Sequence, residues 1–481
     1  MFRVVVFAVL FALSVGIEPA HSFINVCGAW DIDLPQGGAA SQADNSYTPN
    51  IEPTYGSGED IQPIVAVDIT HDNYHTISGR YAGFAKLLRA DGVGVKDFSV
   101  KFPAHDCADS AEIGLTCAGS HAEYLEALEG VDILVIANAT ERISEDEAAV
   151  LSGWLSGDLA CSEGAHCGDR GLFLIADHER DSDFPEKISS LSAEVGLDWP
   201  NYSIGLRGQG ASAESSDLCP TDAEITNATR NLIFEVGDSV DTSVGQLSAD
   251  HPIVLGRQSG ERIRRVKTFF GSAIVDGPGE SILTLSSEDA LWWYDEGEAG
   301  ETKGNATGYS QGMAFRHGLG RVYASGEAAM FTVQTNISGR VWGMQEESID
   351  GEACIGEEEC PDNEQYLLNI IHWLDGILEV EDQALIDTDG DGYYDVEDNC
   401  SEAANPTQFD GDDDGYGNAC DPDFNNDGAV GMDDVGALLR GLNTISPVMD
   451  LDQDGVVAWS DLFTTYYALG LPPGPSGLVP D

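Results

Sequence analysis

Basic residues are scarce in this chain. Of its 481 residues only 22 are Lys or Arg, against 84 Asp or Glu, and the formal net charge is −62 at pH 7. Nucleic acids and anionic membrane surfaces are bound through clustered Lys and Arg, so the composition argues against both as partners. Cations are the partners that this charge favours, and a saline medium would screen the repulsion among the carboxylates.

Long apolar runs are missing after the first residues. A spanning helix needs about 20 consecutive apolar residues, and no segment beyond residue 22 approaches that length. Residues 1–22 have the pattern of a secretory signal peptide, with one charge at Arg3, a following apolar run, and small residues at Ala20 and Ser22. We therefore expect a mature chain that is secreted, has no transmembrane segment, and works outside the cell or at its surface; a retained N-terminal anchor is the alternative.

No two cysteines have the C-x-x-C spacing of common zinc sites, which disfavours a structural zinc. The cysteines number ten, and an even number suits disulfides in an oxidising compartment. Local spacing and elimination favour the pairs Cys107 with Cys117, Cys161 with Cys167, Cys354 with Cys360, and Cys27 with Cys219. Connectivity does not follow from sequence alone, so the last pair is the weakest inference.

Strand-like and helix-like segments alternate between residues 61 and 378. The strands are continuous apolar runs, as in sheets that are buried on both faces, and the segment that begins at Ser144 has Glu147 three residues later, which is a capping-box pattern. We expect strands at 64–67, 131–137 and 171–176, and helices at 80–90, 144–155 and 363–378. Such alternation predicts an α/β fold with a doubly wound, mostly parallel sheet, to which residues 207–343 add further strands and long loops.

Changes in composition divide the chain into several regions. We expect a signal peptide at 1–22, a flexible N-terminal arm at 23–60, the α/β domain at 61–378, an acidic linker at 379–386, calcium repeats at 387–422, a second calcium module at 423–470, and a tail at 471–481.

Four segments near the C-terminus repeat the pattern D-x-[DN]-x-D-G. We name them loop one (387–398), loop two (410–421), loop three (423–434) and loop four (450–461). Calcium takes about six to eight oxygens, which a twelve-residue loop supplies from positions 1, 3, 5, 7, 9 and 12, and glycine at position 6 permits the sharp turn. A solvated acidic tail is the alternative, but four loops with the glycine in register favour calcium.

The expected calcium ligands occupy the same positions in each loop. They are Asp387, Asp389, Asp391, the Tyr393 carbonyl, Asp395 and Asp398; Asp410, Asp412, Asp414, the Tyr416 carbonyl, Asn418 and Asp421; Asp423, Asn425, Asp427, the Ala429 carbonyl and Asp434; and Asp450, Asp452, Asp454, the Val456 carbonyl and Asp461. Position 12 is Asp rather than the Glu of the EF-hand pattern. Position 9 is Gly431 in loop three and Ala458 in loop four, so a water would replace that ligand.

Residues 387–421 resemble thrombospondin type 3 repeats. The resemblance rests on Asp398-Asn399-Cys400, on Asn405-Pro406 followed by Gln408, and on Cys420-Asp421. It implies that metal organises this part of the chain and that Cys400 is bonded to Cys420. Ser401 departs from the usual proline of that family.

Residues 423–469 resemble a type I dockerin, which consists of two calcium loops that are each followed by a helix. Val435, Leu438, Leu439 and Leu442 mirror Leu462, Phe463, Tyr466 and Tyr467, and the resemblance implies that the two halves pack face to face. It also suggests a cohesin-like or cell-surface protein as partner. The positions through which dockerins bind cohesins hold Met432, Asp433, Trp459 and Ser460, which depart from the usual Ser/Thr pairs.

Residues 61–378 resemble a poorly characterised bacterial family with the class I glutamine amidotransferase-like (trehalose-utilisation-type) fold. The motifs that carry the resemblance are Asp68 with His71-Asp72-Asn73 and His75, Ile175-Ala176-Asp177-His178, Gly326-Glu327-Ala328, and Asn369-Ile370-Ile371-His372. Amidotransferases place a nucleophilic cysteine on a tight turn after a strand. The corresponding turn at Asp177 has none, so glutamine hydrolysis is not expected.

Polar residues follow the expected strands of this domain, at the edge where open α/β sheets bind ligands. The candidate catalytic or binding residues are His71, His75, Asp177, His178 and Glu327. Imidazoles and carboxylates together bind transition metals or act as acid and base on a sugar; alternatively, these residues only hydrogen-bond loops and cap helices. Whether the domain is an enzyme stays open at this point.

These observations favour a secreted calcium-binding protein. Its α/β domain would be a ligand-binding or degenerate domain, and its C-terminal calcium loops would form an interaction module. The alternatives are a secreted carbohydrate-active or metal-dependent hydrolase, acting on polysaccharide and tethered by the dockerin-like module, and a purely structural spacer.

Overall fold

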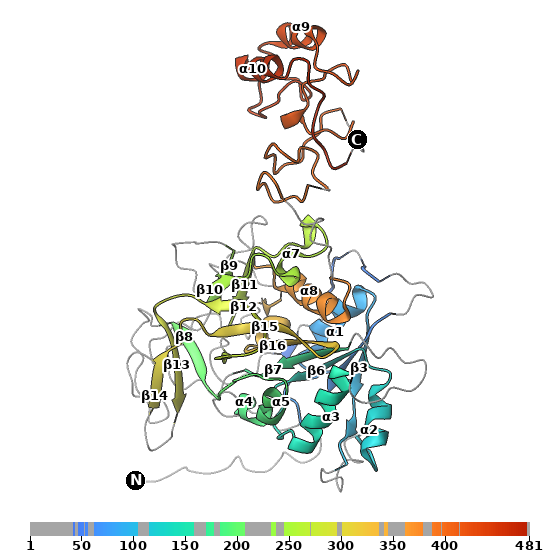
Figure 1. Ribbon diagram of the computed structural model, residues 1–481, viewed down its shortest axis with the longest axis vertical. Coiled ribbons are helices and arrows are strands. Elements are labelled where there is room, and N and C mark those ends of the chain that lie inside the picture. Colours follow the sequence, from blue (N-terminus) through green and yellow to red (C-terminus); the bar gives the residue numbers. More distant parts are fainter. Residues whose placement is uncertain are drawn as a thin grey trace, which may run out of the picture.

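The computed structural model describes residues 42–43, 47–51, 53–55, 62–103, 115–157, 170–177, 183–206, 232–236, 245–269, 271–295, 301–335, 341–344, 361–378, 387–395, 397–412 and 414–478. An α/β domain forms the larger part, and residues 387–478 stand on one edge of it as a narrower projection (Figure 1). We call residues 387–478 the carboxylate module.

A ten-stranded sheet is the centre of the α/β domain. In order across the sheet its strands are β11 (Arg265–Thr268), β9 (Leu232–Glu235), β10 (Gly245–Leu247), β12 (Glu280–Leu285), β15 (Ser310–His317), β16 (Gly320–Ser325), β7 (Gly171–Ile175), β6 (Ile133–Ala137), β2 (Ile64–Asp68) and β3 (Gly94–Phe98). The run from β16 to β3 is parallel throughout, as is the pair β9–β10. The other pairs are antiparallel, so the sheet is mostly parallel, with an antiparallel extension.

Helices cover both faces of the sheet. On one face lie α1 (Ala82–Ala90) and α8 (Asn363–Asp375), and on the other lie α2 (His121–Leu128), α3 (Glu145–Ser156) and α5 (Ser189–Glu194). Side chains alternate along a strand, so Val65 and Val67 of β2 belong to the first core whereas Ala66 belongs to the second. The expected α/β architecture is confirmed, and the six expected strands and helices are all present, most of them within two or three residues of the expected ends.

Smaller elements surround this sheet. Three-stranded sheets are formed by β14 (Glu301–Asn305), β13 (Ala290–Asp295) and β8 (Ser203–Leu206), and by β1 (Gln42–Ala43), β17 (Val333–Thr335) and β18 (Val341–Gly343). The remaining elements of the domain are β4 (Val100–Lys101), β5 (Thr116–Cys117), α4 (Phe184–Lys187), α7 (Pro252–Leu255), η2 (Ser259–Glu261) and η4 (Ala329–Phe331). Among the described residues, no helix has the length and apolarity to cross a membrane.

The carboxylate module contains η5 (Asn418–Cys420), α9 (Met432–Gly441) and α10 (Trp459–Tyr467). Its apolar core is small and consists of Val435, Leu438, Val457 and Leu462, with partly buried neighbours around it. The two helices pack against each other through only some of the apolar residues that mirror each other in the sequence. Leu439 is 50% exposed, and Phe463, Tyr466 and Tyr467 are 56%, 57% and 81% exposed, because each short helix turns only one face to the other.

Backbone hydrogen bonds join the end of the chain to the first two loops. Gly477 N donates to the Asp398 carbonyl at 2.8 Å, and Ser401 N donates to the Pro475 carbonyl at 3.0 Å. Asn418 also donates to the Pro447 carbonyl at 2.5 Å, so residues 387–421 are bonded both to the tail and to residues 423–469.

Cys400 and Cys420 form a disulfide, as the thrombospondin resemblance implied. Cys117 is also disulfide-bonded. The other seven cysteines, the expected signal peptide and linker, and His178 lie outside the described residues.

Candidate functional site

The four loops of the carboxylate module adopt one shared turn. The glycine at position 6 has a positive φ in each loop, between 89° and 104°, where a side chain would be strained. Each of these glycines donates its N–H to the Oδ2 of the aspartate at position 1: Gly392 to Asp387 at 3.2 Å, Gly415 to Asp410 at 2.9 Å, Gly428 to Asp423 at 2.7 Å and Gly455 to Asp450 at 2.9 Å. The register expected from the sequence is thus present in all four loops.

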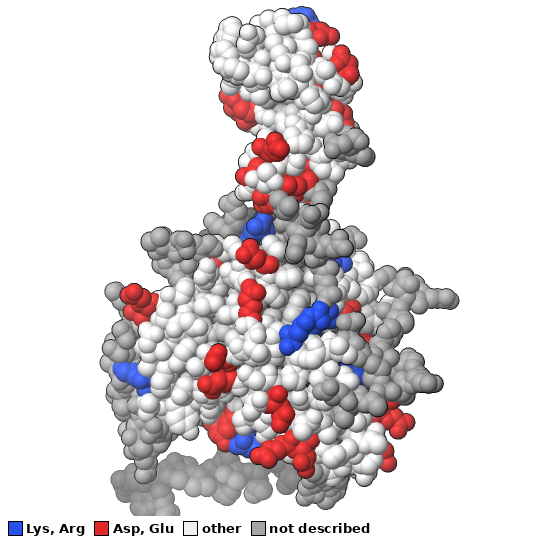
Figure 2. All heavy atoms as spheres, viewed as in Figure 1, with Lys and Arg blue, Asp and Glu red and all other residues white. Residues whose placement is uncertain are grey.

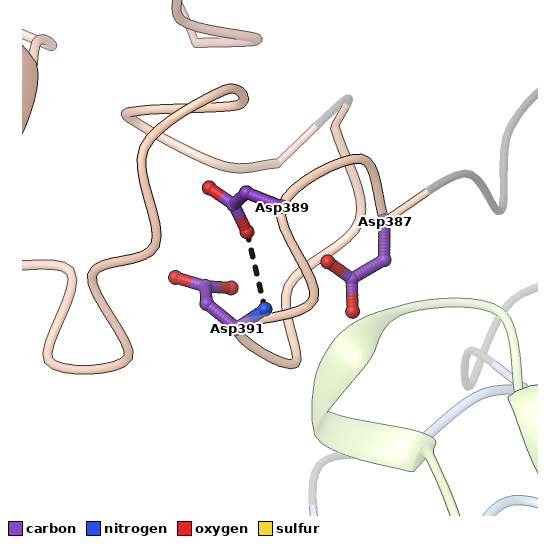
Figure 3. Close-up of side chains that lie close together, drawn as sticks. All are labelled: Asp387, Asp389 and Asp391. Atoms are coloured by element: carbon purple, nitrogen blue, oxygen red, sulfur yellow. Dashed lines mark hydrogen bonds between the residues drawn. The ribbon is translucent and has the colours of Figure 1, made fainter.

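This turn brings carboxylates together. In loop one, Asp387, Asp389 and Asp391 each offer an oxygen, and these oxygens lie within 4.8 Å of one another. Figure 3 shows the three side chains around the turn, with Asp391 N donating to Asp389 Oδ1 at 3.1 Å. Two further clusters of the same size are Asp410 with Asp412 and Asp414, and Asp450 with Asp452 and Asp461.

Two carboxylate oxygens of loop one are buried without any hydrogen-bond donor. They are Oδ2 of Asp389 and Oδ2 of Asp398, and Asp398 is only 1% exposed. Burial raises the pKa of both carboxyls, and the neighbouring aspartates, Asp391 among them, raise it further. A buried polar atom normally has a partner, so these orphaned oxygens fit a cation, and all-oxygen donors are the set that calcium prefers.

Loop two also holds carboxyls whose pKa values are raised. Burial raises the pKa of Asp421 to about 7; a hydrogen bond from Asp423 N opposes this shift, and the charges of Asp414 and Asp412 add to it. Burial followed by the charge of Asp414 also raises the pKa of Asp412. Like charges held this close repel each other, and a divalent cation would relieve that repulsion.

Some expected ligands have other bonds. Both oxygens of Asp395 accept from Thr388, the backbone N–H at 2.7 Å and the hydroxyl at 2.6 Å. The Asn418 side chain accepts from Gly411 N at 2.8 Å and donates to the Pro447 carbonyl at 2.5 Å. The side chains at position 9 of loops one and two are therefore hydrogen-bonded to other residues of the protein.

At position 12, buried aspartates of loops three and four also begin the helices. Oδ2 of Asp434 accepts from Gly431 N, and Oδ2 of Asp461 accepts from Ala458 N, both at 2.7 Å. Each carboxylate thereby caps the first turn of α9 or α10. Its other oxygen faces the loop: Asp434 Oδ1 accepts from Asn425, and Asp461 Oδ1 accepts from Leu451 N.

In the α/β domain, His71 lies between two buried carboxylates. Its Nδ1 is 2.8 Å from Asp68 Oδ2 and its Nε2 is 3.2 Å from Glu147 Oε2, while Tyr124 donates to Glu147 Oε1 at 2.8 Å. Burial alone would lower the pKa of His71, but Asp68 and Glu147 raise it to about 10. Both ring nitrogens are therefore donors to carboxylates, which favours a structural role.

Sequence reasoning assigned Glu147 only to a helix cap. Ser144 does accept from Glu147 N at 3.2 Å, so half of the capping box forms. The Glu147 side chain instead points inward to His71 and Tyr124. The one signal in the sequence for this inward contact is that Glu147 lies on the side of α3 that faces the core and His71.

His75 has a different environment. Asp177 N donates to Asn138 Oδ1 at 2.9 Å, so the Asn138 amide nitrogen faces His75 Nδ1, 3.3 Å away. His75 Nδ1 must then accept, and the proton lies on Nε2, which is buried without a partner. Burial and then the charge of Arg80 lower the pKa of His75 well below its usual value, so the ring is neutral and presents an N–H donor rather than a metal ligand.

Glu327, another of the sequence candidates, is a buried carboxyl that is affected by the charge of Asp177. Both oxygens of Glu327 accept backbone N–H groups, from Ala329 at 2.7 Å and from Met330 at 2.8 Å. Burial and then the charge of Asp177 raise the pKa of Glu327 well above its usual value. The structure thus separates the sequence candidates: His71 lies between buried carboxylates, His75 is linked through Asn138 to the Asp177 backbone, and Glu327 is bonded to the backbone of Ala329 and Met330. Within the described ranges, the groups of His, Cys, Asp and Glu that could hold a metal are all in the carboxylate module.

No family model and no curated protein sequence matches this chain. Among solved structures it is similar to the mmIFT52 N-terminal domain, with 12% identity, a TM-score of 0.34, and coverage of 65% of this chain and 97% of that one. It is also similar to a cold-adapted β-galactosidase from Rahnella sp. R3 (11% identity, TM-score 0.28, 56% of this chain) and to the exo-β-1,4-mannosidase Op5Man5 from Opitutaceae bacterium strain TAV5 (12%, 0.24, 56%). The matches span only 29% and 31% of those two enzymes, and TM-scores this low carry no argument.

Proposed function

We propose that this chain is a secreted calcium-binding protein whose four C-terminal loops bind calcium and thereby fold an interaction module attached to an α/β domain. The observation that carries the proposal is the pair of buried, unpartnered carboxylate oxygens in loop one. One belongs to Asp389, which clusters with Asp387 and Asp391, and the other belongs to Asp398, whose pKa the charge of Asp391 also raises. Leaving such atoms without a partner costs about 1–3 kcal/mol each, and more when they are charged.

Calcium suits these loops better than the other common cations. Their ligands are carboxylate and carbonyl oxygens without imidazole or thiolate, which disfavours zinc and copper. Magnesium demands near-ideal octahedral geometry and keeps several waters, whereas a twelve-residue loop with several carboxylates suits the larger and more tolerant calcium ion. The residues expected to hold it are those at positions 1, 3, 5 and 12, together with the carbonyl at position 7.

The two helices of the module offer a surface for a protein partner. Trp459, Phe463, Tyr466 and Tyr467 of α10 are 56–81% exposed, and exposed aromatic clusters are typical of binding sites. A cohesin-like or cell-surface protein is the partner that we propose, and calcium would be required because it holds α10 in place.

For the α/β domain we propose ligand binding without glutamine hydrolysis. One observation keeps the alternative of a secreted carbohydrate-active hydrolase: His75, with an unpartnered ring nitrogen, follows β2 at the carboxyl edge of the parallel strands, where open α/β sheets bind ligands.

Isothermal titration calorimetry of the full chain tests the calcium proposal. We expect calcium to bind with affinities of roughly 10⁻⁴–10⁻³ M or tighter, and magnesium to bind more weakly. Asp452→Asn, which neutralises one ligand of loop four, should remove about one site, whereas Asp198→Asn in the α/β domain should remove none. Equal titrations for both variants, or no calcium heat at all, would refute the proposal.

A further inference from the structure

The residue at position 8 of each loop shows what supports that loop. In loops three and four it is Val430 and Val457, which are 1% and 0% exposed inside the carboxylate module. In loop two it is Gly417, which has no side chain. In loop one it is Tyr394, also 1% exposed, and its contacts are with the α/β domain. The side chain at position 8 of loop one is therefore held by the other part of the molecule.

Tyr394 is fixed to the segment that joins α7 to η2. Its hydroxyl donates to the Leu255 carbonyl at 2.6 Å, and its backbone N–H donates to Ser259 Oγ at 3.0 Å. The Arg262 guanidinium lies over its ring, 5.7 Å from the centroid, within the range of a cation–π contact. Burial raises the pKa of the Tyr394 hydroxyl to about 12, even though Arg262 opposes that shift.

Two acidic residues of loop one extend this contact. Glu397 Oε1 accepts from both the backbone N–H and the hydroxyl of Ser259. Asp387 Oδ2 accepts from Arg262 Nη1 at 3.0 Å. Residues at positions 1, 8 and 11 of loop one thus bind a stretch of only eight residues of the α/β domain, from Leu255 to Arg262.

That stretch is firmly held by the body of the domain. Asn369 of α8 is fully buried, and its amide donates to the carbonyls of Ile253 at 2.9 Å and Glu261 at 2.8 Å. Arg257 donates from its backbone N–H and from Nε to Glu261 Oε2 at 2.9 Å and 3.0 Å. The segment is therefore held rigidly, and we call residues 255–262 the platform. When loop one is ordered against the platform, the direction in which the carboxylate module projects is fixed (Figure 1).

We propose that loop one is an interdomain calcium site, in which bound calcium holds the carboxylate module on the α/β domain through Tyr394 and Glu397. This inference rests on the proposed calcium function. Asp387 and the Tyr393 carbonyl occupy ligand positions, and Tyr394 directly follows one of them, so a loop ordered around calcium has Tyr394 already directed at Leu255 and Ser259. By linkage, calcium strengthens the docking and the docking strengthens calcium binding by the same factor.

Hydrogen exchange measured by mass spectrometry on the full chain tests this inference. A peptide spanning 253–263 reports on the platform, and a peptide from loops three and four reports on calcium binding elsewhere. Calcium should slow hydrogen exchange in both peptides of the wild type. A tenfold slower exchange rate corresponds to about 1.4 kcal/mol of added protection. In Asp389→Asn the loop three and four peptide should still respond and the platform should not, whereas the matched Asp452→Asn variant should retain the platform response.

Tyr394→Phe sharpens the test because it removes only the hydroxyl. The calcium concentration that gives half of the platform protection should rise by about two- to tenfold, as expected for one lost hydrogen bond, while Tyr202→Phe, at a ring of the α/β domain that stacks on Trp292, should leave it unchanged. A platform that ignores calcium while loops three and four respond would overturn the inference and leave the calcium function intact. If neither peptide responds, the proposed function fails as well.

Discussion

The α/β domain and the carboxylate module both bury charged groups, but they neutralise them differently. In the domain, buried charges meet opposite charges, as His71 does between Asp68 and Glu147. In the module, the partly buried carboxylate of Asp389 and the buried carboxylate of Asp398 lie close to other carboxylates. The domain therefore carries its own counter-charges, whereas we propose that the module takes its counter-charges from solution as cations.

Composition makes this difference unavoidable. From residue 387 to the end of the sequence, Arg440 is the only basic residue and no histidine is present. Figure 2 shows acidic side chains at several places on the visible face of the module, with basic side chains mostly on the α/β domain. The module sets only a small apolar core of four buried side chains against that repulsion, and for this reason we propose that it depends on bound metal.

The largest expected effect is on the domain side of the comparison. Glu147→Ala removes one counter-charge of the buried His71 and leaves the Tyr124 hydroxyl without its acceptor. The free energy of unfolding of the α/β domain should therefore fall by about 3–5 kcal/mol. Urea unfolding followed by tryptophan fluorescence measures it. Glu145→Ala, at an exposed position of the same helix, is the control and should change little. A Glu147→Ala protein as stable as this control would show that the charge network is not needed.

A pH series sharpens the same contrast. The folded pKa of His71 is about 10, above the usual value of about 6.5 in an unfolded chain. Its stabilising contribution is therefore complete below about pH 6.5 and is lost as the pH rises through about 10, which lowers the domain's unfolding free energy by a few kcal/mol. The urea midpoint of the domain should fall between pH 7 and pH 10, and His71→Gln should flatten the decline. Identical slopes in the two proteins would contradict this assignment.

A smaller effect is expected from shortening the module. Truncation after Pro473 removes the backbone bonds to Asp398 and Ser401, and also the bond from Gly474 N to the Cys420 carbonyl at 3.1 Å. In saturating calcium the module should lose about 2 kcal/mol of stability, measured by its thermal transition, while the domain's transition stays fixed. Truncation after Leu478 keeps these bonds and is the control. An unchanged transition after the longer truncation would mean that the tail does not brace the loops.

The sequence predicted the domain's framework because its signals are local. Continuous apolar runs predicted β2, β6 and β7, and helical spacing predicted α1, α3 and α8. The sequence did not predict the strand β3, because two of its five residues, Lys96 and Asp97, are exposed and charged and interrupt the apolar run. The antiparallel extension was foreseen only as unspecified strands, since its pairings join residues far apart in the chain, such as Leu283 with Gly312.

The candidate sites divide in the same way. The turn of each of the four loops depends on residues within six positions, so the sequence was sufficient to predict it. The contact of Tyr394 with Leu255 spans 139 residues, and the bond of Glu147 to His71 spans 76. Contacts of that kind depend on the tertiary fold, and one sequence holds no local signal for them.

Differential scanning calorimetry of the full chain, in calcium and then in excess chelator, tests the central claim most directly. We expect two thermal transitions in calcium. In chelator the transition of the carboxylate module should be lost completely, while the transition of the α/β domain persists. A truncated chain ending at residue 378 identifies which transition belongs to the domain. Identical thermograms with and without chelator would show that the carboxylate module folds without metal, and would contradict the account.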